Sequence, residues 1–188
     1  MHRPTLFLLL LVFTIACNNP NPKPTASIIV HGGAGYVTTD DMTEQEEEEI
    51  RATIEKSLQK SQQHLANGGT SVEAVRIAIN ILEDSPYFNA GKGSVFNSSG
   101  TNELDASIMD GQNGQAGAVA GLTNIKNPID AAIAVMEHSP HVFLIGKGAE
   151  EFALNHGMDT VPQSYFYNEN RYLEHIEGLV EEKRKFGT

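Results

Sequence analysis

A stretch of small and polar residues between Leu82 and Gly121 constrains the fold of this chain more than any other segment. Glycine, alanine, asparagine and serine recur along it, and it is nearly free of apolar periodicity. Residues this small suit a backbone that turns sharply and packs closely against another part of the molecule. Short apolar islands at 107–109 and 117–121 distinguish the stretch from a spacer. We therefore expect it to build a site or a tight scaffold.

Length and charge set the outer limits on fold and partners. The 188 residues suffice for one domain with a hydrophobic core. A hydrophobic content of 40% and a charged content of 20% are typical of a globular protein. The formal net charge of -11 argues against nucleic acid or an anionic membrane surface as a partner. The acidic run at 44–49 is interpreted as a solvated helix start, because carboxylates favour the positive end of the helix dipole.

Residues 1–16 have the features of a secretory signal peptide. Arg3 supplies a basic region, and the apolar run at 6–15 is shorter than the roughly 20 residues that span a bilayer. Cys17 is the only cysteine, and residues 14–17 are similar to a lipobox, although Thr14 stands where leucine is usual. We expect export to the periplasm or cell envelope, with a membrane anchor on Cys17; the alternative is an ordinary cleaved signal. Residues 17–26, with three prolines, then form a tether.

Apolar spacing predicts strands that interleave with helices in the rest of the chain. The expected helices, bounded by capping or proline signals, are 43–66, 70–84, 127–139, 149–155 and 173–180. The expected strands are the short apolar runs at 27–31, 106–109, 116–120 and 142–145. A loop is expected at 157–163 and a charged, mobile tail at 181–185. The predicted fold class is α/β, or layered α+β, with a sheet covered by helices.

Several common site motifs are excluded by spacing. Gly91-Lys92-Gly93-Ser94 has the wrong residue after its lysine for a phosphate-binding loop, and residues 32–35 lack the third glycine of a dinucleotide fingerprint. His138 and His141 are separated by Ser-Pro, and no Glu or Cys completes a zinc set with them. Asp105 and Asp110 could act as acid-base carboxylates, but aspartate in a Gly/Asn-rich turn usually caps its own backbone.

Longer motifs recur in a fixed order along the chain. They are His31-Gly32-Gly33-Ala34-Gly35, LEDSPYFNAGKG at 82–93, ELDASIMDG at 103–111, GAVAG at 117–121, SPHV at 139–142 and the final Gly187-Thr188. Together they resemble the N-terminal half of the plant-type asparaginase and isoaspartyl peptidase family. The resemblance implies an N-terminal nucleophile hydrolase with an αββα sandwich, made as an inactive precursor that cleaves itself at a Gly-Thr bond. Residues 27–187 would then be the α-subunit portion, and Thr188 the first residue of the β-subunit.

The same resemblance implies roles for individual residues. Cleavage between Gly187 and Thr188 would free the nucleophile, Thr188, whose own amine can act as base because α-amines titrate near about 8. Asn89 would lie near the nucleophile, and His31, Gly32 and Gly33 would lie beside the scissile bond. No organic cofactor is implied. A structural sodium ion would be bound, mostly through main-chain carbonyls, by a loop that corresponds to Leu82, Glu83, Ser85, Phe88, Ala90 and Lys92.

The implied activity is hydrolysis of β-aspartyl dipeptides and of the side-chain amide of L-asparagine, by a dimer of αβ units. The β-subunit half, which supplies further catalytic and substrate-binding groups, does not lie within these residues. If the protein ends at Thr188, the sandwich is incomplete and apolar strand faces are exposed. Cleavage would then release only threonine, and we expect no hydrolase activity from this chain alone. The alternatives are a glycosylasparaginase-type amidase and a non-catalytic lipoprotein that retains the α half.

Overall fold

The computed structural model describes residues 26–33 and 42–187. The predicted signal peptide, Cys17 and nearly all of the tether lie outside the described residues, as do Ala34, Gly35 and Thr188. Within the described ranges, no helix combines the length and the apolar character needed to cross a membrane. The elements in chain order are α1 (Glu44–Ala66), α2 (Ser71–Glu83), η1 (Gly91–Gly93), β1 (Leu104–Met109), β2 (Ala116–Leu122), α3 (Pro128–His138), β3 (Phe143–Ile145), α4 (Gly146–Asn155), η2 (Gln163–Tyr165) and α5 (Glu169–Phe186).

The helix starts follow the capping signals in the sequence. Thr43 caps α1 by accepting a hydrogen bond from Glu46 N at 3.2 Å, and the Glu46 carboxylate accepts one from Thr43 N at 2.9 Å. Thr70 caps α2 in the same way, with Glu73 N at 3.2 Å. The Glu73 carboxylate, however, pairs with Arg76 at 2.8 Å, so only half of the predicted capping box forms.

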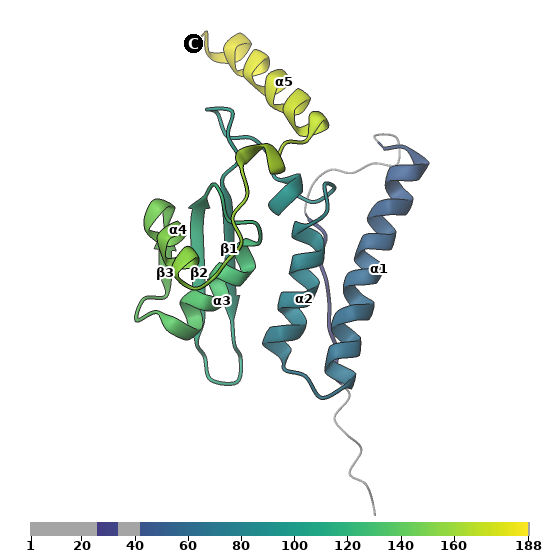
Figure 1. Ribbon diagram of the computed structural model, residues 1–188. Coiled ribbons are helices and arrows are strands. Elements are labelled where there is room, and N and C mark those ends of the chain that lie inside the picture. Colours follow the sequence, from purple (N-terminus) through teal and green to yellow (C-terminus); the bar gives the residue numbers. More distant parts are fainter. Residues whose placement is uncertain (1–25, 34–41, 188) are drawn as a thin grey trace, which may run out of the picture.

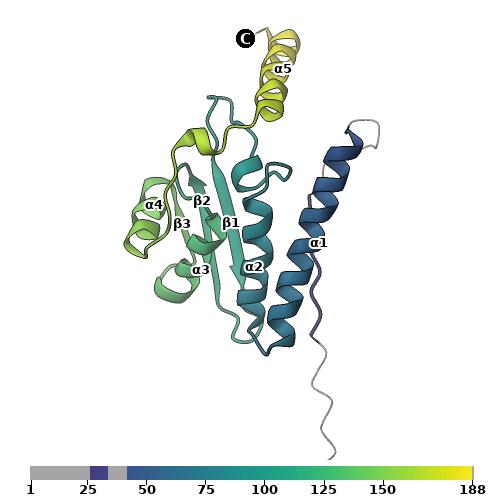
Figure 2. The same ribbon diagram turned by 45° about the vertical axis from the view of Figure 1, so that its right-hand side comes forward.

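The sheet is small and mixed. Strands β1 and β2 pair antiparallel, and β2 and β3 pair parallel, in the order β1-β2-β3. Helices α3 and α4 cover one face of this sheet, while α2 packs beside α3 and α1 packs outside α2 (Figures 1 and 2). The α/β class predicted from the sequence is confirmed.

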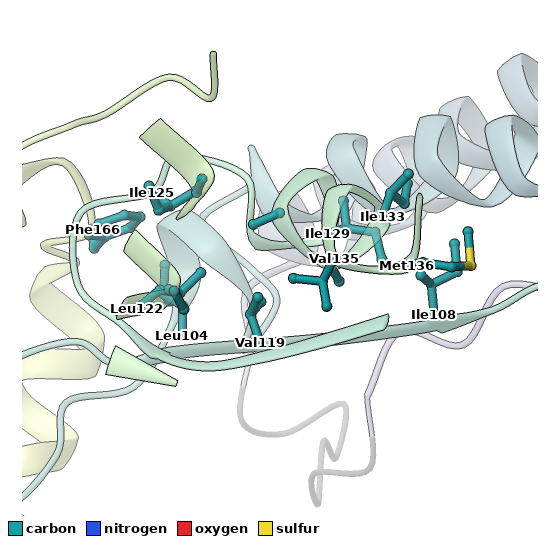
Figure 3. Close-up of a cluster of buried hydrophobic side chains, with 14 residues drawn as sticks. Leu104, Ile108, Val119, Leu122, Ile125, Ile129, Ile133, Val135, Met136 and Phe166 are labelled. Carbon is teal, nitrogen blue, oxygen red and sulfur yellow. The ribbon is translucent and has the colours of Figure 1, made fainter. Parts of the chain in front are cut away.

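The hydrophobic core lies between the sheet and α3 (Figure 3). Val119 and Leu122 from β2, Val135 from α3 and Phe166 from the C-terminal segment are each at most 1% exposed. Gly117 allows β2 to approach α3 closely, because a Cβ there would clash with the Ala132 carbonyl and lie 2.8 Å from the Met136 side chain. A glycine in the central strand thus sets the separation of the two layers.

Helices α1 and α2 pack through small side chains. Ser57 and Ser61 on α1 are fully buried, opposite Ala74 and Ala78 on α2, which are 1% and 2% exposed. The Ser57 hydroxyl donates to the Ala78 carbonyl at 3.2 Å, and the Ser61 hydroxyl donates to the Ser57 carbonyl at 2.7 Å. The two hydroxyl groups are therefore buried without loss of hydrogen bonding.

Two predicted segments differ from the structure. The buried strand predicted at 27–31 is wrong: this segment is extended, but no described strand lies beside it to complete a ladder, and Ile29 is 94% exposed. The mobile tail predicted at 181–185 is also wrong, since these residues continue α5. A salt bridge of 2.9 Å between Lys185 and Glu181 supports that last turn.

The second face of the sheet is uncovered by any described element. Alternate residues of the strands face it, among them Met109, Phe143 and Ile145, which are 67%, 55% and 64% exposed. Ala118 and Ala120 lie between them in a shallow depression. This exposure agrees with the expectation that an α half by itself would present an apolar strand face.

Candidate active site

The loop that follows α2 is anchored by Phe88. Its ring is buried, at 5% exposure, and lies against the segment that contains Gly32. A Cβ on Gly32 would lie 3.1 Å from the Phe88 ring and 3.3 Å from Ile54 of α1. The neighbouring His31 accepts a hydrogen bond at Nδ1 from Gly33 N at 3.2 Å. The structure therefore brings together two motifs far apart in sequence, His31–Gly33 and the predicted sodium loop.

Main-chain carbonyl groups converge on the two glycines of η1. A Cβ on Gly91 would clash with the carbonyl oxygen of Glu83, and a Cβ on Gly93 would clash with that of Phe88. Gly91 also has a φ of +52°, a conformation that other residues adopt only at a cost. Only glycine fits at these positions, and the carbonyls of two predicted ion ligands, Glu83 and Phe88, each lie directly against one of these glycines.

Other predicted residues of the sodium loop are linked through their main chains. Leu82 is 5% exposed, and its carbonyl accepts a hydrogen bond from Ser85 N at 3.1 Å. The Ala90 carbonyl accepts one from Gly93 N at 3.2 Å. Lys92 points elsewhere, because its Nζ lies 5.8 Å from the centre of the Tyr165 ring, a cation-π distance. The loop geometry thus comes from main-chain groups rather than from the Lys92 side chain.

Glu83 uses its side chain for a structural purpose. Its carboxylate is 3% exposed and accepts hydrogen bonds from Ile129 N at 3.0 Å and from Asn127 Nδ2 at 3.1 Å, which caps the start of α3. Burial raises the pKa of Glu83 to about 8, the two hydrogen bonds oppose that rise, and the charges of Asp130 and Asp84 add to it. Glu83 therefore ties α3 to the loop, with its main-chain carbonyl and its Cβ against Gly91 and its carboxylate on α3.

Asn89 is held through its oxygen. Its Oδ1 accepts a hydrogen bond from Val95 N at 3.0 Å, while the residue itself is exposed. Nδ2 makes no hydrogen bond to any residue of the described ranges. The amide is therefore oriented by one end and has its two N–H donors available at the other.

Asn102, which was not predicted from the sequence, fixes the far end of the same loop. It is 1% exposed, and its Nδ2 donates to the carbonyls of Ser94 at 2.9 Å and Val95 at 3.2 Å. Gln163 in turn accepts from Asn102 N at 3.0 Å and donates to its carbonyl at 3.0 Å. Asn102 thereby positions Val95, the partner of Asn89. Nothing distinguished it in a stretch rich in asparagine, because its partner Gln163 lies 61 residues away.

Helix α5 joins the loop at one end only. In its first turn, Asn168 Nδ2 donates to the Pro86 carbonyl at 3.1 Å and Arg171 Nε donates to the Gly93 carbonyl at 3.3 Å. Gly187 ends the 18-residue helix in a left-handed conformation, with φ of 71°. A helix of this length extends about 27 Å, so the C-terminal end of α5 lies far from the loop (Figures 1 and 2). Thr188 is outside the described residues, and its predicted place beside Asn89 stays a prediction.

Two carboxylates that could have served in acid-base chemistry have structural partners. Asp105 Oδ1 accepts a hydrogen bond from Gly121 N at 2.8 Å, and Asp110 Oδ1 accepts one from Gln112 N at 2.9 Å. The turn-capping role is confirmed for Asp110, which binds within its own turn. It is wrong for Asp105, which lies in β1 and accepts its hydrogen bond from β2. Across residues 26–33 and 42–187, no group of three or more His, Cys, Asp or Glu side chains is arranged to hold a metal ion.

Comparison with known proteins defines the class of this chain. The asparaginase family matches residues 24–186, nearly the whole chain, and the mixed sheet with its helical layer is consistent with the N-terminal nucleophile hydrolase fold of that family. The chain therefore belongs to the asparaginase family that the motifs indicate.

Similar relatives carry more specific names. A Dictyostelium discoideum relative is 46% identical over 83% of this chain and 45% of its own length. The isoaspartyl peptidase of Escherichia coli is 40% identical over 87% of this chain and 55% of its own length. The isoaspartyl peptidase/L-asparaginase of Mus musculus is 41% identical over 80% of this chain and 44% of its own length. The chain thus spans about half the length of the curated relatives it matches.

Proposed function

We propose that this chain is the α-subunit portion of a self-cleaving isoaspartyl peptidase/L-asparaginase. The observation that carries the proposal is the match of residues 24–186 to this family, with relatives named isoaspartyl peptidase at 38–46% identity. Substrates would be β-aspartyl dipeptides and L-asparagine.

Cleavage would create the catalytic base together with the nucleophile. In the uncut chain the nitrogen of Thr188 is an amide, which cannot take up a proton, and the hydroxyl group therefore lacks a base. Once freed, the α-amine can accept the hydroxyl proton while Oγ1 attacks the substrate carbonyl. The amide C–N bond would then break, the α-ammonium group would return the proton to the leaving ammonia or amino acid, and water would hydrolyse the resulting acyl-enzyme and release aspartate. The Nδ2 donors of Asn89, which have no hydrogen-bond partner among residues 26–33 and 42–187, support a role in orienting Thr188 or its substrate.

A sodium ion would stabilise the loop that carries Asn89. The carbonyl oxygens of Leu82, Glu83, Phe88 and Ala90 would supply hard ligands, and the crowding of carbonyls around η1 fits such a site. A buried hydroxyl without a hydrogen-bond partner among the described residues, Ser94 Oγ, lies at the end of the same loop. The ion would fix the loop and take no part in bond making.

The β-subunit half would cover the open face of the sheet. That face presents Met109, Phe143 and Ile145 to solvent, and a second sheet packed on it would complete a layered sandwich. Two such αβ units would form a dimer. Export through the signal at 1–16 and a lipid anchor on Cys17 would place the enzyme in the cell envelope.

Substrate assays test this function. The α-subunit portion produced with a β-subunit half should release aspartate from β-aspartyl dipeptides and ammonia from L-asparagine, whereas the 188-residue polypeptide by itself should do neither. Exclusive hydrolysis of glycosylated asparagine would indicate a glycosylasparaginase-type amidase. A mature αβ protein inactive on all three substrates would contradict an enzymatic role and favour a non-catalytic lipoprotein.

A further inference from the structure

Two histidines meet at the ends of neighbouring helices, away from the candidate active site. His138 is the last residue of α3, and His156 caps the end of α4. Their ring centres are 5.4 Å apart, and the ring planes differ by only 5°. The pair borders a cleft of about 410 Å³, whose wall also contains Glu137 and Asp159.

The orientation of His156 is set by its own helix. Its Nδ1 lies 2.8 Å from the Phe152 carbonyl, and the Phe152 ring packs against the imidazole at a centre-to-centre distance of 4.1 Å. Because a carbonyl only accepts, Nδ1 carries the hydrogen in this contact, which leaves Nε2 with a free lone pair. Histidines that bind metal ions almost always donate their other N–H in this way.

The electrostatic surroundings of the pair favour a cation. Both side chains lie at helix C-termini, where unpaired carbonyls carry partial negative charge. The Glu137 carboxylate is 3.7 Å from His138 Nε2. The guanidinium group of Arg76 lines the same cleft. Its positive charge is paired with the carboxylates of Asp130 and Glu73, each with a nitrogen–oxygen distance of 2.8 Å.

We propose that His138 and His156 bind one divalent transition-metal ion, such as Zn²⁺, and thereby join the ends of α3 and α4. With metal–nitrogen bonds of about 2.0–2.1 Å and a tetrahedral angle, the centres of two coordinating imidazoles lie about 5 Å apart. The observed separation of 5.4 Å is close to that distance. His156 already has Nε2 free, so a rotation of the His138 ring alone would be needed to direct its Nε2 at the same ion. Water molecules complete the coordination, because no third His, Cys, Asp or Glu side chain of the described residues is arranged to hold a metal ion with this pair. This site is independent of the proposed hydrolase function.

Calorimetric titration of Zn²⁺ into untagged, chelator-treated protein tests the site. The wild-type protein should bind one equivalent through this pair, and His138→Gln and His156→Gln should each weaken that binding about tenfold or more. His141→Gln is the matched control, because His141 is an exposed histidine in the next turn that does not line the cleft. Absence of Zn²⁺ binding, unchanged affinity in either variant, or an equal loss in His141→Gln would overturn the proposal.

Thermal melting separates metal binding from a packing defect. With chelator present, wild-type protein and all three variants should melt at similar temperatures, which shows that the substitutions leave the fold intact. Addition of Zn²⁺ should raise the melting temperature of the wild type and His141→Gln only. His138 lies on α3, whereas Phe152, which holds the His156 ring, lies on α4. If Zn²⁺ raised the melting temperature of His138→Gln as much as that of the wild type, the two histidines would not share an ion.

Discussion

Substitution of Asn89 by aspartate separates the catalytic role of this residue from its structural one. The carboxylate of Asn89→Asp would keep an oxygen that accepts from Val95 N at 3.0 Å, lose the two N–H donors and gain a negative charge. The loop should therefore retain its conformation. Asn89→Ala, in contrast, loses both functions, and its exposed hydrogen bond contributes about 0.5–1.5 kcal/mol to the free energy of unfolding.

The two variants should differ in stability and agree in activity. Asn89→Asp should melt within about 1 °C of the wild type, whereas Asn89→Ala should lose about 2–4 °C per kcal/mol at this chain length. Both should lower kcat for β-aspartyl dipeptides about 10²- to 10³-fold, the usual effect of losing one aligned donor at an active site. Melting curves and steady-state kinetics on the mature αβ protein measure the two effects.

The result that would refute this reasoning is specific. If Asn89→Asp retains nearly full activity, the N–H donors of Asn89 are not used in catalysis, and the residue serves only to hold Val95. If Asn89→Asp is instead as unstable as Asn89→Ala, the Oδ1 contact does not orient the loop as the structure indicates. In either case the assignment of Asn89 to the active site fails on its stated grounds.

Three further predictions follow from packing and charge. The pKa of Glu83 is raised from its ordinary value of 4.5 to about 8, so the folded state binds this proton more tightly than the unfolded state. The contribution of Glu83 to the free energy of unfolding is full below about pH 4.5 and decreases by about 5 kcal/mol between about pH 4.5 and 8. Urea denaturation should show this decrease in the wild type and not in Glu83→Gln. The same pH profile for both proteins would contradict the prediction. Gly117→Ala should cost about 1–3 kcal/mol in the same assay, because its methyl group would push Ala132 and α3 off the sheet; wild-type stability would show that the layers can separate freely. Ile145→Lys on the open face should reduce aggregation of the 188-residue polypeptide in light scattering and prevent pairing with a β-subunit half, and normal pairing would exclude this face as the interface.

Local signals in the sequence predicted most of the secondary structure. Thr43, Thr70 and Pro128 mark helix starts that the structure confirms, because each acts through groups within one turn. Strand β1 begins two residues earlier than the predicted 106–109, and β2 extends two residues beyond the predicted 116–120. The apolar spacing thus identified elements but not their limits.

Tertiary partners account for what the sequence did not predict. Residues 27–31 have the composition of a strand, but no described strand lies beside them to form hydrogen bonds. The composition of a segment does not show whether such a neighbour is present. The cap that Glu83 provides for α3 depends on Ile129, 46 residues away. The contact between His138 and His156 likewise depends on how the ends of two helices meet. The charge run at 181–185 does not by itself distinguish a tail from an exposed helix, because such runs are typical of both.

Self-cleavage at Gly187-Thr188 is the most direct test of the proposed function. Intact-mass and N-terminal analysis of the purified protein, produced with a β-subunit half in the same reading frame, should show two fragments, with Thr188 at the start of the second. Thr188→Ala should give one uncut chain without activity. An uncut wild-type chain that hydrolyses β-aspartyl dipeptides, or a cut at any other bond, would contradict the account.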